Sequence, residues 1–304
     1  SPTPEEPAAL AMAVEKAKET DAELVMASDP DADRVGAAVK NNEGEWVLLN
    51  GNQTALMFVY YLITRWKELG KINGKEYIVK TIVTTETIKT IAERNGVEMY
   101  DVYTGFKWIA NVMRENEGKK NYIGGGEESY GFLCEDFVRD KDAVSACVIL
   151  AEIAAWAKDQ GLSLYQLLQK IYVEYGFSKE KGISVVKKGK SGAEEIEAMM
   201  KKFRENPLTE IAGSKVTYFY DYSTLKGKDY AENETVTLDM PTTSNVLQYF
   251  TEDNTKVSIR PSGTEPKIKF YCEVHSKVKS IDELPEAEKA AEEKINQIKA
   301  SLGI

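Results

Sequence analysis

The chain has 304 residues, a formal net charge of −10, 42% hydrophobic residues and 29% charged residues. This length can bury two or three cores, the composition is globular, and no apolar run approaches the ~18 residues that a membrane-spanning helix needs. The acidic balance disfavours a nucleic-acid partner, which would require clustered Lys and Arg, so we expect a soluble protein in which a local basic site for a small anion is still allowed.

Cysteine and histidine usage limits the chemistry. Cys134, Cys147 and Cys272 are an odd number and lie far apart, which favours reduced core residues in a cytosolic protein over disulfides or a CxxC metal site. The single histidine, His275, would have to carry any histidine-based catalytic scheme. Its context, CEVHSKV, favours a surface position at the end of a strand.

The start of the chain predicts one helix and a pair of strands. Residues 5–19 carry apolar positions at helical spacing, and residues 24–27 and 35–39 have the pattern of strands joined by the segment DPDADR. The chain begins SPTPEEPAALAMAVEKAKE, without an initiator Met, so we expect it to be a piece of a larger protein.

Short apolar runs then alternate with helical patterns, from residue 46 to the strand-like NYI at 121–123. Gly70 and Gly96 stand where helices commonly end. This alternation predicts a βαβ-type, largely parallel sheet with helices on both faces. Two more helices are expected at 142–158 and 162–175.

The pattern changes around residues 176–182. A charged helix is followed by strand-like runs with hairpin turns and by a last charged helix over 281–302. The expected fold class is therefore α/β plus α+β: the tail of one α/β domain, a complete mixed or parallel α/β domain, and a C-terminal antiparallel-sheet domain with helices. The expected boundaries are 1–43, 44–175 and 176–304.

Three carboxylates stand at alternating positions in DPDADR. Asp29, Asp31 and Asp33 can converge in an extended loop, and close carboxylates repel one another unless a cation lies between them. Oxygen ligands select Mg²⁺, Ca²⁺ or Mn²⁺. An EF-hand does not fit, because Arg34 and Lys40 stand at the positions where that loop requires Gly and Glu. The DxDx phosphatase pattern does not fit either, because Asp33 stands where that motif has Thr or Val. A solvated acidic turn is the alternative without function.

Two further segments offer groups for a phosphorylated sugar. In GGGEESYGF, glycines let a ligand approach the backbone, and Glu127 and Ser129 offer an acceptor and a hydroxyl for sugar hydroxyls. In YTGFKWIANVM, Lys107 lies near the start of a helix, where a cation is unfavourable unless an anion joins it. A Gly-rich turn and an ordinary surface lysine are the respective alternatives.

RPSGTEPKIKFY lies between two strands of the last domain. Its turn combines hydroxyls and backbone amides with a cation at each edge, which suits a phosphate. An ordinary hairpin turn is the alternative. The candidate phosphate ligands here are Arg260, Ser262, Gly263, Thr264 and Lys267.

The motifs DPDADR, TGFKW, GGEESYG and RPSGTEP, in this order, resemble those of the α-D-phosphohexomutase superfamily, the phosphoglucomutases and phosphomannomutases. The resemblance runs over essentially the whole chain, and four ordered motifs are more specific than any one of them. Members of this superfamily have four domains around one cleft. The chain would comprise the end of the second domain and all of the third and fourth.

The resemblance implies a role for each motif. Asp29, Asp31 and Asp33 would ligate Mg²⁺, and Arg34 would lie beside the phosphoryl-carrying site. In the superfamily a phosphoserine gives its phosphoryl group to the sugar, a glucose 1,6-bisphosphate-type intermediate turns around, and the other phosphate returns to the serine. Sugar hydroxyls would be held by Glu127 and Ser129, and the phosphate by Lys107, Arg260, Ser262, Gly263 and Thr264.

One motif of the superfamily is absent from this chain. The nucleophilic serine lies in a first-domain loop resembling TASHNP, and Ser129 and Ser262 belong to ligand-holding motifs instead. We therefore expect a C-terminal portion that binds Mg²⁺ weakly and does not turn over alone, its partners being the missing N-terminal domains and a small phosphosugar. No nucleic acid or membrane is expected as a partner.

The expected full-length activity is the interconversion of hexose 1-phosphate and hexose 6-phosphate in the cytoplasm. EESYG and TGFKW are more similar to the glucose and pentose branch than to the N-acetylglucosamine branch, so glucose is ranked first. A haloacid-dehalogenase-like phosphatase with Asp29 as nucleophile and a non-catalytic phosphosugar-binding protein are the competing hypotheses.

Overall fold

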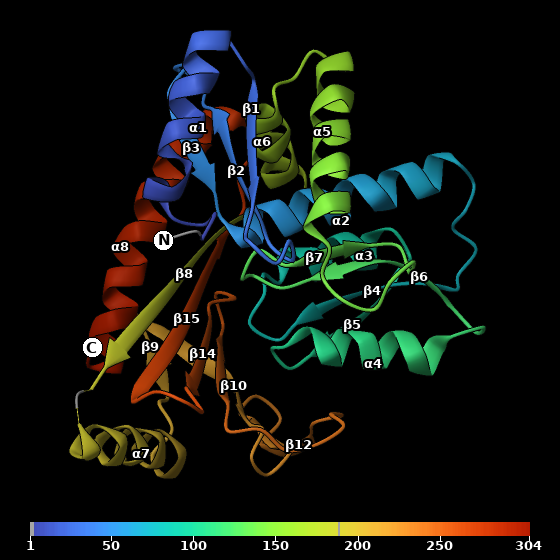
Figure 1. Ribbon diagram of the computed structural model, residues 1–304. Helices are drawn as coiled ribbons and strands as arrows, with labels where there is room; N and C mark the ends of the chain where they lie inside the picture. Colours follow the sequence, from blue (N-terminus) through green and yellow to red (C-terminus); the bar gives the residue numbers. More distant parts are fainter. Residues whose placement is uncertain (1–2, 188) are drawn as a thin grey trace. The chain divides into compact units, whose positions relative to one another are not determined.

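The computed structural model describes residues 3–187 and 189–304, and the chain divides into two compact units at Tyr175 and Gly176 (Figure 1). The elements of unit 1 are α1 (Pro7–Thr20), β1 (Leu24–Ser28), β2 (Val35–Lys40), β3 (Trp46–Leu49), α2 (Gly51–Glu68), β4 (Glu76–Thr81), α3 (Thr87–Arg94), β5 (Glu98–Val102), α4 (Phe106–Asn116), β6 (Asn121–Gly126), β7 (Phe132–Cys134), α5 (Ala143–Asp159) and α6 (Leu164–Tyr175).

The first strands of unit 1 form a small antiparallel sheet beside α1. β1 and β2 pair up to Ser28 and Val35, so the DPDADR segment is the connection of a hairpin, and β3 pairs with the other side of β2. Leu10 of α1 packs with Val25 and Ala38 of the two strands, as Figure 1 shows for the elements themselves. The predicted helix and strand pair are confirmed.

A second sheet in unit 1 has the strand order β5-β4-β6-β7. β4 is parallel to β5 and to β6, while β7 is antiparallel to β6, which confirms the largely parallel sheet. Tyr77 and Val79 of β4 form one core with α4, and on the other face α2 stacks Phe58 on Phe132 of β7, with ring centroids 4.6 Å apart. Figure 1 shows α2 and α4 on opposite sides of these strands.

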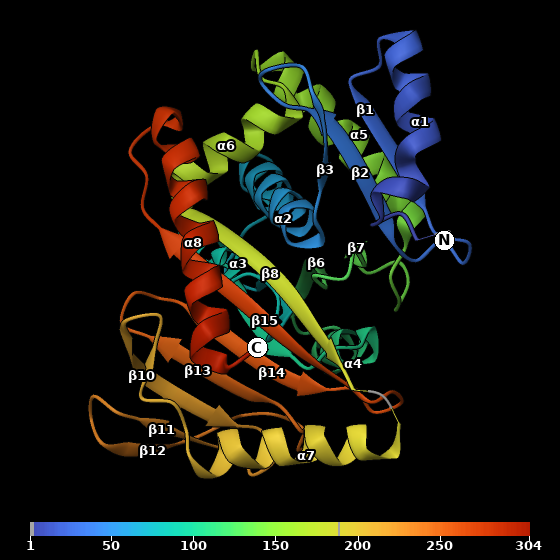
Figure 2. The same cartoon turned by 90° about the vertical axis from the view of Figure 1, so that its left-hand side faces the viewer.

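Unit 2 contains an antiparallel sheet with the order β12-β11-β10-β13-β14-β15-β8, with β9 paired to β10. Helices α7 and α8 pack on it (Figure 2), and Phe203 of α7 lies 6.2 Å from Phe270 of β15 between ring centroids. Its elements are β8 (Phe177–Val186), α7 (Lys190–Glu205), β9 (Glu210–Ile211), β10 (Ser214–Asp221), β11 (Lys226–Asp229), β12 (Glu234–Thr237), β13 (Leu247–Thr251), β14 (Lys256–Pro261), β15 (Lys267–Ser276), the short 3-10 helix η1 (Ile281–Glu283) and α8 (Leu284–Leu302).

His275 is not the surface residue that its sequence context predicts. Its side chain is 20% exposed, and Nε2 lies 2.6 Å from Oε1 of Glu273, a carboxylate that also pairs with Lys256 at 3.2 Å. Burial would lower the pKa of His275, but the charge and hydrogen bond of Glu273 outweigh burial and raise it. The sequence places Glu273 two residues before His275, but it does not show that this carboxylate also pairs with Lys256 on the adjacent strand β14.

All three cysteines are free thiols; Cys134 and Cys272 are buried, and Cys147 is half-buried on α5. Among the helices of the described residues, none is both long enough and apolar enough to cross a bilayer.

Candidate functional site

The carboxyl ends of the parallel strands in unit 1 meet at one edge of the sheet, which is where ligands bind in α/β proteins. β5 is followed by the TGFKW segment, and β6 is followed by the loop 127–131 of the GGGEESYG motif. The structure brings these two motifs together, because the amide of Gly105 donates to Oε1 of Glu127 at 2.7 Å.

Glu127 is a buried carboxyl group with a fixed orientation. The residue is 7% exposed, and its own amide donates to the carbonyl oxygen of Gly131 at 2.8 Å. Burial raises the pKa of Glu127 above its ordinary value, although the Gly105 amide and the charges of Lys141 and Arg34 act in the opposite direction. The hydrogen bond from Gly105 holds one carboxyl oxygen and thereby fixes the direction of the second.

The glycines that precede Glu127 have a different role from the predicted one. Gly124, Gly125 and Gly126 lie inside β6 and not in a ligand-facing turn. A Cβ at Gly125 would lie 2.5 Å from the carbonyl oxygen of Val79, and one at Gly126 would lie 2.4 Å from the Phe132 ring. These positions therefore lack side chains because the core has no room for them, which corrects the expectation that they let a ligand approach.

The loop 127–131 is joined to the aspartate loop, residues 29–34. Arg34 forms an antiparallel bridge with Gly131, and the amide of Val35 donates to the carbonyl of Tyr130 at 3.1 Å. Tyr130 adopts a left-handed conformation, with φ of 71°, that turns the loop toward this bridge. Three of the predicted motifs therefore meet within unit 1.

The three aspartates converge as their spacing predicts. One carboxylate oxygen each from Asp29, Asp31 and Asp33 lies within 4.8 Å of the others. Oδ1 of Asp29 also accepts the amides of Asp33 and Arg34 at 3.1 and 3.0 Å, and the left-handed Ala32 (φ 56°) closes the loop. Among the described residues, the buried Oδ1 of Asp33 has no hydrogen-bond partner. This donor set fits a hard divalent cation such as Mg²⁺.

The pKa values of the two half-buried aspartates, Asp29 and Asp33, shift in opposite directions. Burial would raise the pKa of Asp29, but the hydrogen bonds from Arg34 and Asp33 outweigh it and hold the pKa below the ordinary range. Burial and the Asp29 carboxylate raise the pKa of Asp33, against the opposing effect of Lys141.

Lys141 is a site residue that the sequence reasoning missed. Its Nζ lies 3.0 Å from Oδ2 of Asp33 and 3.3 Å from Asp140, and its side chain is 16% exposed. The glycine at 131 makes room for it, because a Cβ there would lie 2.3 Å from Cδ of Lys141. The available signal was RDKD, a lysine between two aspartates directly before a helix.

Arg34 and Lys107 are the two cations that the motifs place in unit 1. Nη1 of Arg34 lies 3.5 Å from Oε1 of Glu5, and its Nε lies 3.9 Å from Asp33. Lys107 is the second residue of α4 and is exposed, with Nζ 5.1 Å from the centre of the Trp108 ring. Ser129 is half-buried. The roles of Lys107 and Ser129 in ligand binding stay predictions.

The RPSGTEP loop lies in unit 2, between β14 and β15. Oγ of Ser262 accepts the amides of Thr264 and Glu265 at 3.3 and 3.2 Å, so an anion would compete with this hydroxyl for those amides. Nη2 of Arg260 donates to the Tyr271 hydroxyl at 3.2 Å, whereas its buried Nε has no hydrogen-bond partner among the described residues.

The exposed part of this loop has space around it. A Cβ on Gly263 would meet no atom within 4 Å, and a cavity of ≈ 770 Å³ lies between residues 261–266 and α7. Lys267 lies 3.5 Å from Glu265 at the far edge of the turn. Phosphate binding by this loop stays a prediction.

Three domain models of one protein family match successive parts of the chain. Residues 1–44 match the phosphoglucomutase/phosphomannomutase alpha/beta/alpha domain II, residues 50–175 match domain III, and residues 184–291 match the C-terminal domain. The order of the matches is the order of the motifs.

Similar proteins carry the same family name. The chain is 34% identical over 275 residues to a phosphoglucomutase of Staphylococcus haemolyticus, which covers 90% of this chain and 49% of the relative. It is 38% identical over 271 residues to a phosphoglucomutase of Staphylococcus aureus strain MRSA252, which covers 89% and 48%. The chain thus spans about half the length of the curated relatives it matches.

Solved structures agree with the fold. A phosphoglucomutase/phosphomannomutase family protein from Burkholderia thailandensis superposes with a TM-score of 0.59 and 19% identity, covering 99% of this chain and 51% of that one. The pp63/parafusin phosphoglucomutase of Paramecium gives 0.56 and 18%, covering 93% and 46%.

Proposed function

Because the chain belongs to the phosphoglucomutase/phosphomannomutase family, an isomerase family, we propose that it supplies the metal-, sugar- and phosphate-binding parts of an enzyme that interconverts hexose 1-phosphate and hexose 6-phosphate. The observation that supports this most is the meeting of three motifs in unit 1. Glu127 accepts the amide of Gly105, and Gly131 bridges to Arg34 of the aspartate loop. These contacts bring an oriented acceptor next to a group of three carboxylates.

In this proposal Asp29, Asp31 and Asp33 hold Mg²⁺, whose charge would stabilise negative charge on a transferring phosphoryl group. The amides of Asp33 and Arg34 orient Asp29 for that task.

Two cations near the aspartates would bind the phosphate oxygens. Arg34 is the last residue of the aspartate loop and lies next to Asp33, and Lys141 contacts the same carboxylate from the segment just before α5. A guanidinium group and an ammonium group at such positions can neutralise charge that builds up during phosphoryl transfer.

The sugar and its second phosphate need their own ligands. We infer that the free oxygen of Glu127 and the hydroxyl of Ser129 bind sugar hydroxyls, and that Lys107 binds an anion at the start of α4. The loop of unit 2 would bind a phosphate through Arg260, Ser262, Gly263, Thr264 and Lys267. Hydroxyls, glycine amides and cations are the groups that bind phosphate in proteins.

We further propose that the nucleophilic serine belongs to a part of the enzyme outside these 304 residues, since Ser129 and Ser262 lie in the loops to which this proposal gives ligand binding. The reaction would pass through a phosphoserine and a glucose 1,6-bisphosphate-type intermediate. Glucose phosphates are the preferred substrate class, which agrees with the names of the curated relatives. A cytosolic location agrees with the three free cysteines.

Two experiments test the proposal. The coding sequence upstream of Ser1 should encode a TASHNP-like segment, and a stop codon or an unrelated domain there would contradict the proposed mutase. A protein that includes this segment should convert glucose 1-phosphate to glucose 6-phosphate in a coupled dehydrogenase assay. Mannose 1-phosphate and ribose 1-phosphate, tested as alternative substrates, should be converted more slowly. The 304-residue chain alone should show no turnover, and turnover by it would refute the assignment of the serine.

A further inference from the structure

We propose that Glu128, Thr81 and Thr84 form a clasp that holds the loop 127–131 in the position in which Glu127 and Ser129 can bind a sugar. Glu128 is then a positioning residue between two ligand-binding residues. This inference rests on the proposed function, because the clasp would hold the loop that carries the proposed sugar ligands. Hydrogen exchange tests the clasp, and sugar-phosphate binding tests the proposed function.

The two neighbouring glutamates are bound to different elements. Glu127 reaches the amide of Gly105, which follows β5. Oε2 of Glu128 instead accepts from the hydroxyls of Thr81, the last residue of β4, and Thr84, three residues later, at 3.1 and 3.2 Å. The amide of Glu128 also donates to the hydroxyl oxygen of Thr84 at 3.2 Å. Both the side chain and the backbone of Glu128 are therefore attached to one threonine.

The hydroxyls of Thr81 and Thr84 lie 2.7 Å apart, so they interact with each other as well as with Glu128. The two hydroxyl oxygens and Oε2 of Glu128 make three short contacts with one another, but only two hydroxyl hydrogens are available for them. Only two of these contacts are therefore hydrogen bonds at any time. The group is compact and polar, and loss of either hydroxyl leaves a half-buried carboxylate with one donor fewer.

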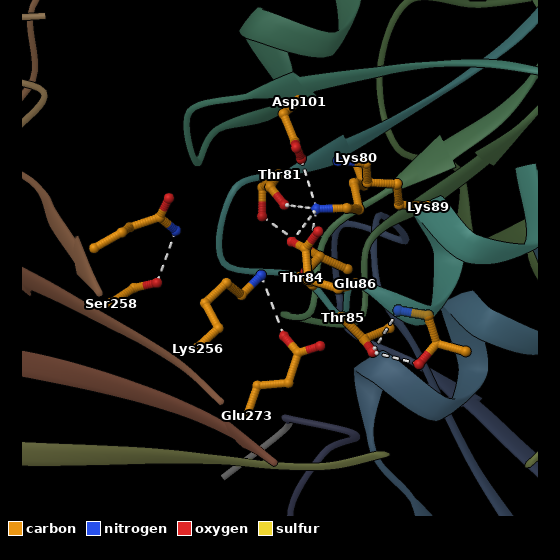
Figure 3. A network of polar contacts seen from close by, with 12 residues as sticks. Lys80, Thr81, Thr84, Thr85, Glu86, Lys89, Asp101, Lys256, Ser258 and Glu273 are labelled. Carbon is orange, nitrogen blue, oxygen red and sulfur yellow. Dashed lines mark hydrogen bonds and ion pairs between the residues drawn. The ribbon is translucent and has the colours of Figure 1, made fainter. Parts of the chain in front are cut away.

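The turn that carries the threonines is itself held by a buried cation. Lys80 has no exposed side-chain surface, and its Nζ lies 2.6 Å from Asp101 and 3.0 Å from Glu86 (Figure 3). The same ammonium group donates to the carbonyl of Thr84 at 3.4 Å. Because a buried ammonium group is costly unless it is fully paired, these contacts fix the residues from Thr81 to Glu86 as a rigid base.

The loop is supported on another side by α2. A Cβ on Gly51 would lie 1.9 Å from the carbonyl oxygen of Glu128, so helix and loop are in backbone contact. Asn52 accepts the amide of Thr85 at 2.9 Å, which joins the same helix to the threonine turn. Removing the clasp therefore frees one side of the loop while the other supports remain, and a local effect is expected.

The first measurement is hydrogen exchange in the 304-residue chain. Thr84→Val removes the hydroxyl at nearly constant volume, and Thr84→Ser keeps the hydroxyl. Thr90→Val is the matched control, because the Thr90 hydroxyl contacts the carbonyl oxygen of Glu86, the residue before α3, at the long distance of 3.5 Å. We expect the amides of residues 126–131 to exchange about tenfold faster in Thr84→Val than in wild type, since a half-buried acceptor loses a donor. Thr84→Ser and Thr90→Val should resemble the wild type.

The second measurement is binding, followed by calorimetry with glucose 6-phosphate and with inorganic phosphate. Thr84→Val should weaken glucose 6-phosphate by about tenfold and leave inorganic phosphate unchanged, because only the sugar contacts depend on the clasp. Thr84→Ser should restore the wild-type affinity.

Each outcome separates the two proposals. The clasp would be overturned if the amides of residues 126–131 exchanged at the same rate in Thr84→Val and Thr90→Val. It would also be overturned if Thr84→Ser did not keep the exchange rates of the wild type. Faster exchange in Thr84→Val, together with a wild-type chain that has no affinity for glucose 6-phosphate, would support the clasp and count against the proposed function.

Discussion

Replacing Lys80 by Met removes the buried ammonium group that lies between two carboxylates while nearly preserving the volume of the side chain. Asp101 and Glu86 would then lose the ammonium group that both contact, although their side chains keep 35% and 25% of their surface exposed. Water can therefore relieve part of the repulsion.

The expected loss of stability follows from this partial exposure. Removing one partner of a fully buried ion pair costs about 3–5 kcal/mol, and the exposed fractions favour the lower end, about 3 kcal/mol. Lys89→Met is the matched control, since Lys89 lies 3.9 Å from Glu93 and the two side chains are 49% and 64% exposed. The control should lose at most about 0.5 kcal/mol.

Tryptophan fluorescence during urea unfolding measures this difference in unit 1 alone. The four tryptophans of the chain are all in that unit: Trp46, Trp66, Trp108 and Trp156. A loss in Lys80→Met that is equal to the loss in Lys89→Met would refute the role given to Lys80. The double change Lys80→Met with Asp101→Leu should regain part of the stability, because it removes one of the two carboxylates that lose the Lys80 ammonium group.

Three further predictions concern the metal ligands, the histidine and the contact between α2 and the loop. Asp33→Asn should weaken Mg²⁺ binding by about tenfold or more in calorimetry, whereas Asp21→Asn, at a 95% exposed side chain, should not change it. The NMR titration of His275 should have its midpoint above pH 6.5, and Glu273→Gln should lower that midpoint. Because folding raises the pKa of His275, the stability gained from its protonation is complete below pH 6.5 and is lost as the pH rises through the folded pKa. Gly51→Ala should destabilise unit 1 by about 1–3 kcal/mol in urea unfolding, since the added Cβ would lie 1.9 Å from a carbonyl oxygen.

Each of these has a result that would contradict it. Unchanged Mg²⁺ affinity in Asp33→Asn would remove that carboxylate from the site. A histidine midpoint at or below 6.5 would show that burial outweighs the Glu273 contact. Wild-type stability in Gly51→Ala would mean that α2 and the loop are not in close backbone contact.

The parts of the fold that the sequence predicts are those with local causes. The hairpin on either side of DPDADR follows from two short apolar runs and the turn between them, and the parallel sheet follows from strands that alternate with helices. The convergence of Asp29, Asp31 and Asp33 has a local cause too, because alternating residues of one extended loop point the same way.

The parts that it does not predict depend on contacts between distant residues. Thr81 and Glu128 are 47 residues apart, and neither stands out until the turn after β4 and the loop after β6 lie at the same sheet edge. Lys141 reaches Asp33 only because α5 begins beside the aspartate loop, where the amide of Ala143 donates to the carbonyl of Ala32 at 2.9 Å. Periodicity and spacing carry no information on such pairs.

The position of the three glycines inside β6 affects how the motif can be used as a signature. Gly124, Gly125 and Gly126 satisfy a steric demand of the sheet, whereas Glu127 and Ser129 are the groups proposed to meet a ligand. A search pattern that covers both the glycines and the two polar residues therefore combines a requirement of strand packing with a requirement of ligand binding. A protein that kept the glycines but lost the acceptor and the hydroxyl would still score as a partial match, although it would have inherited only the packing of this strand.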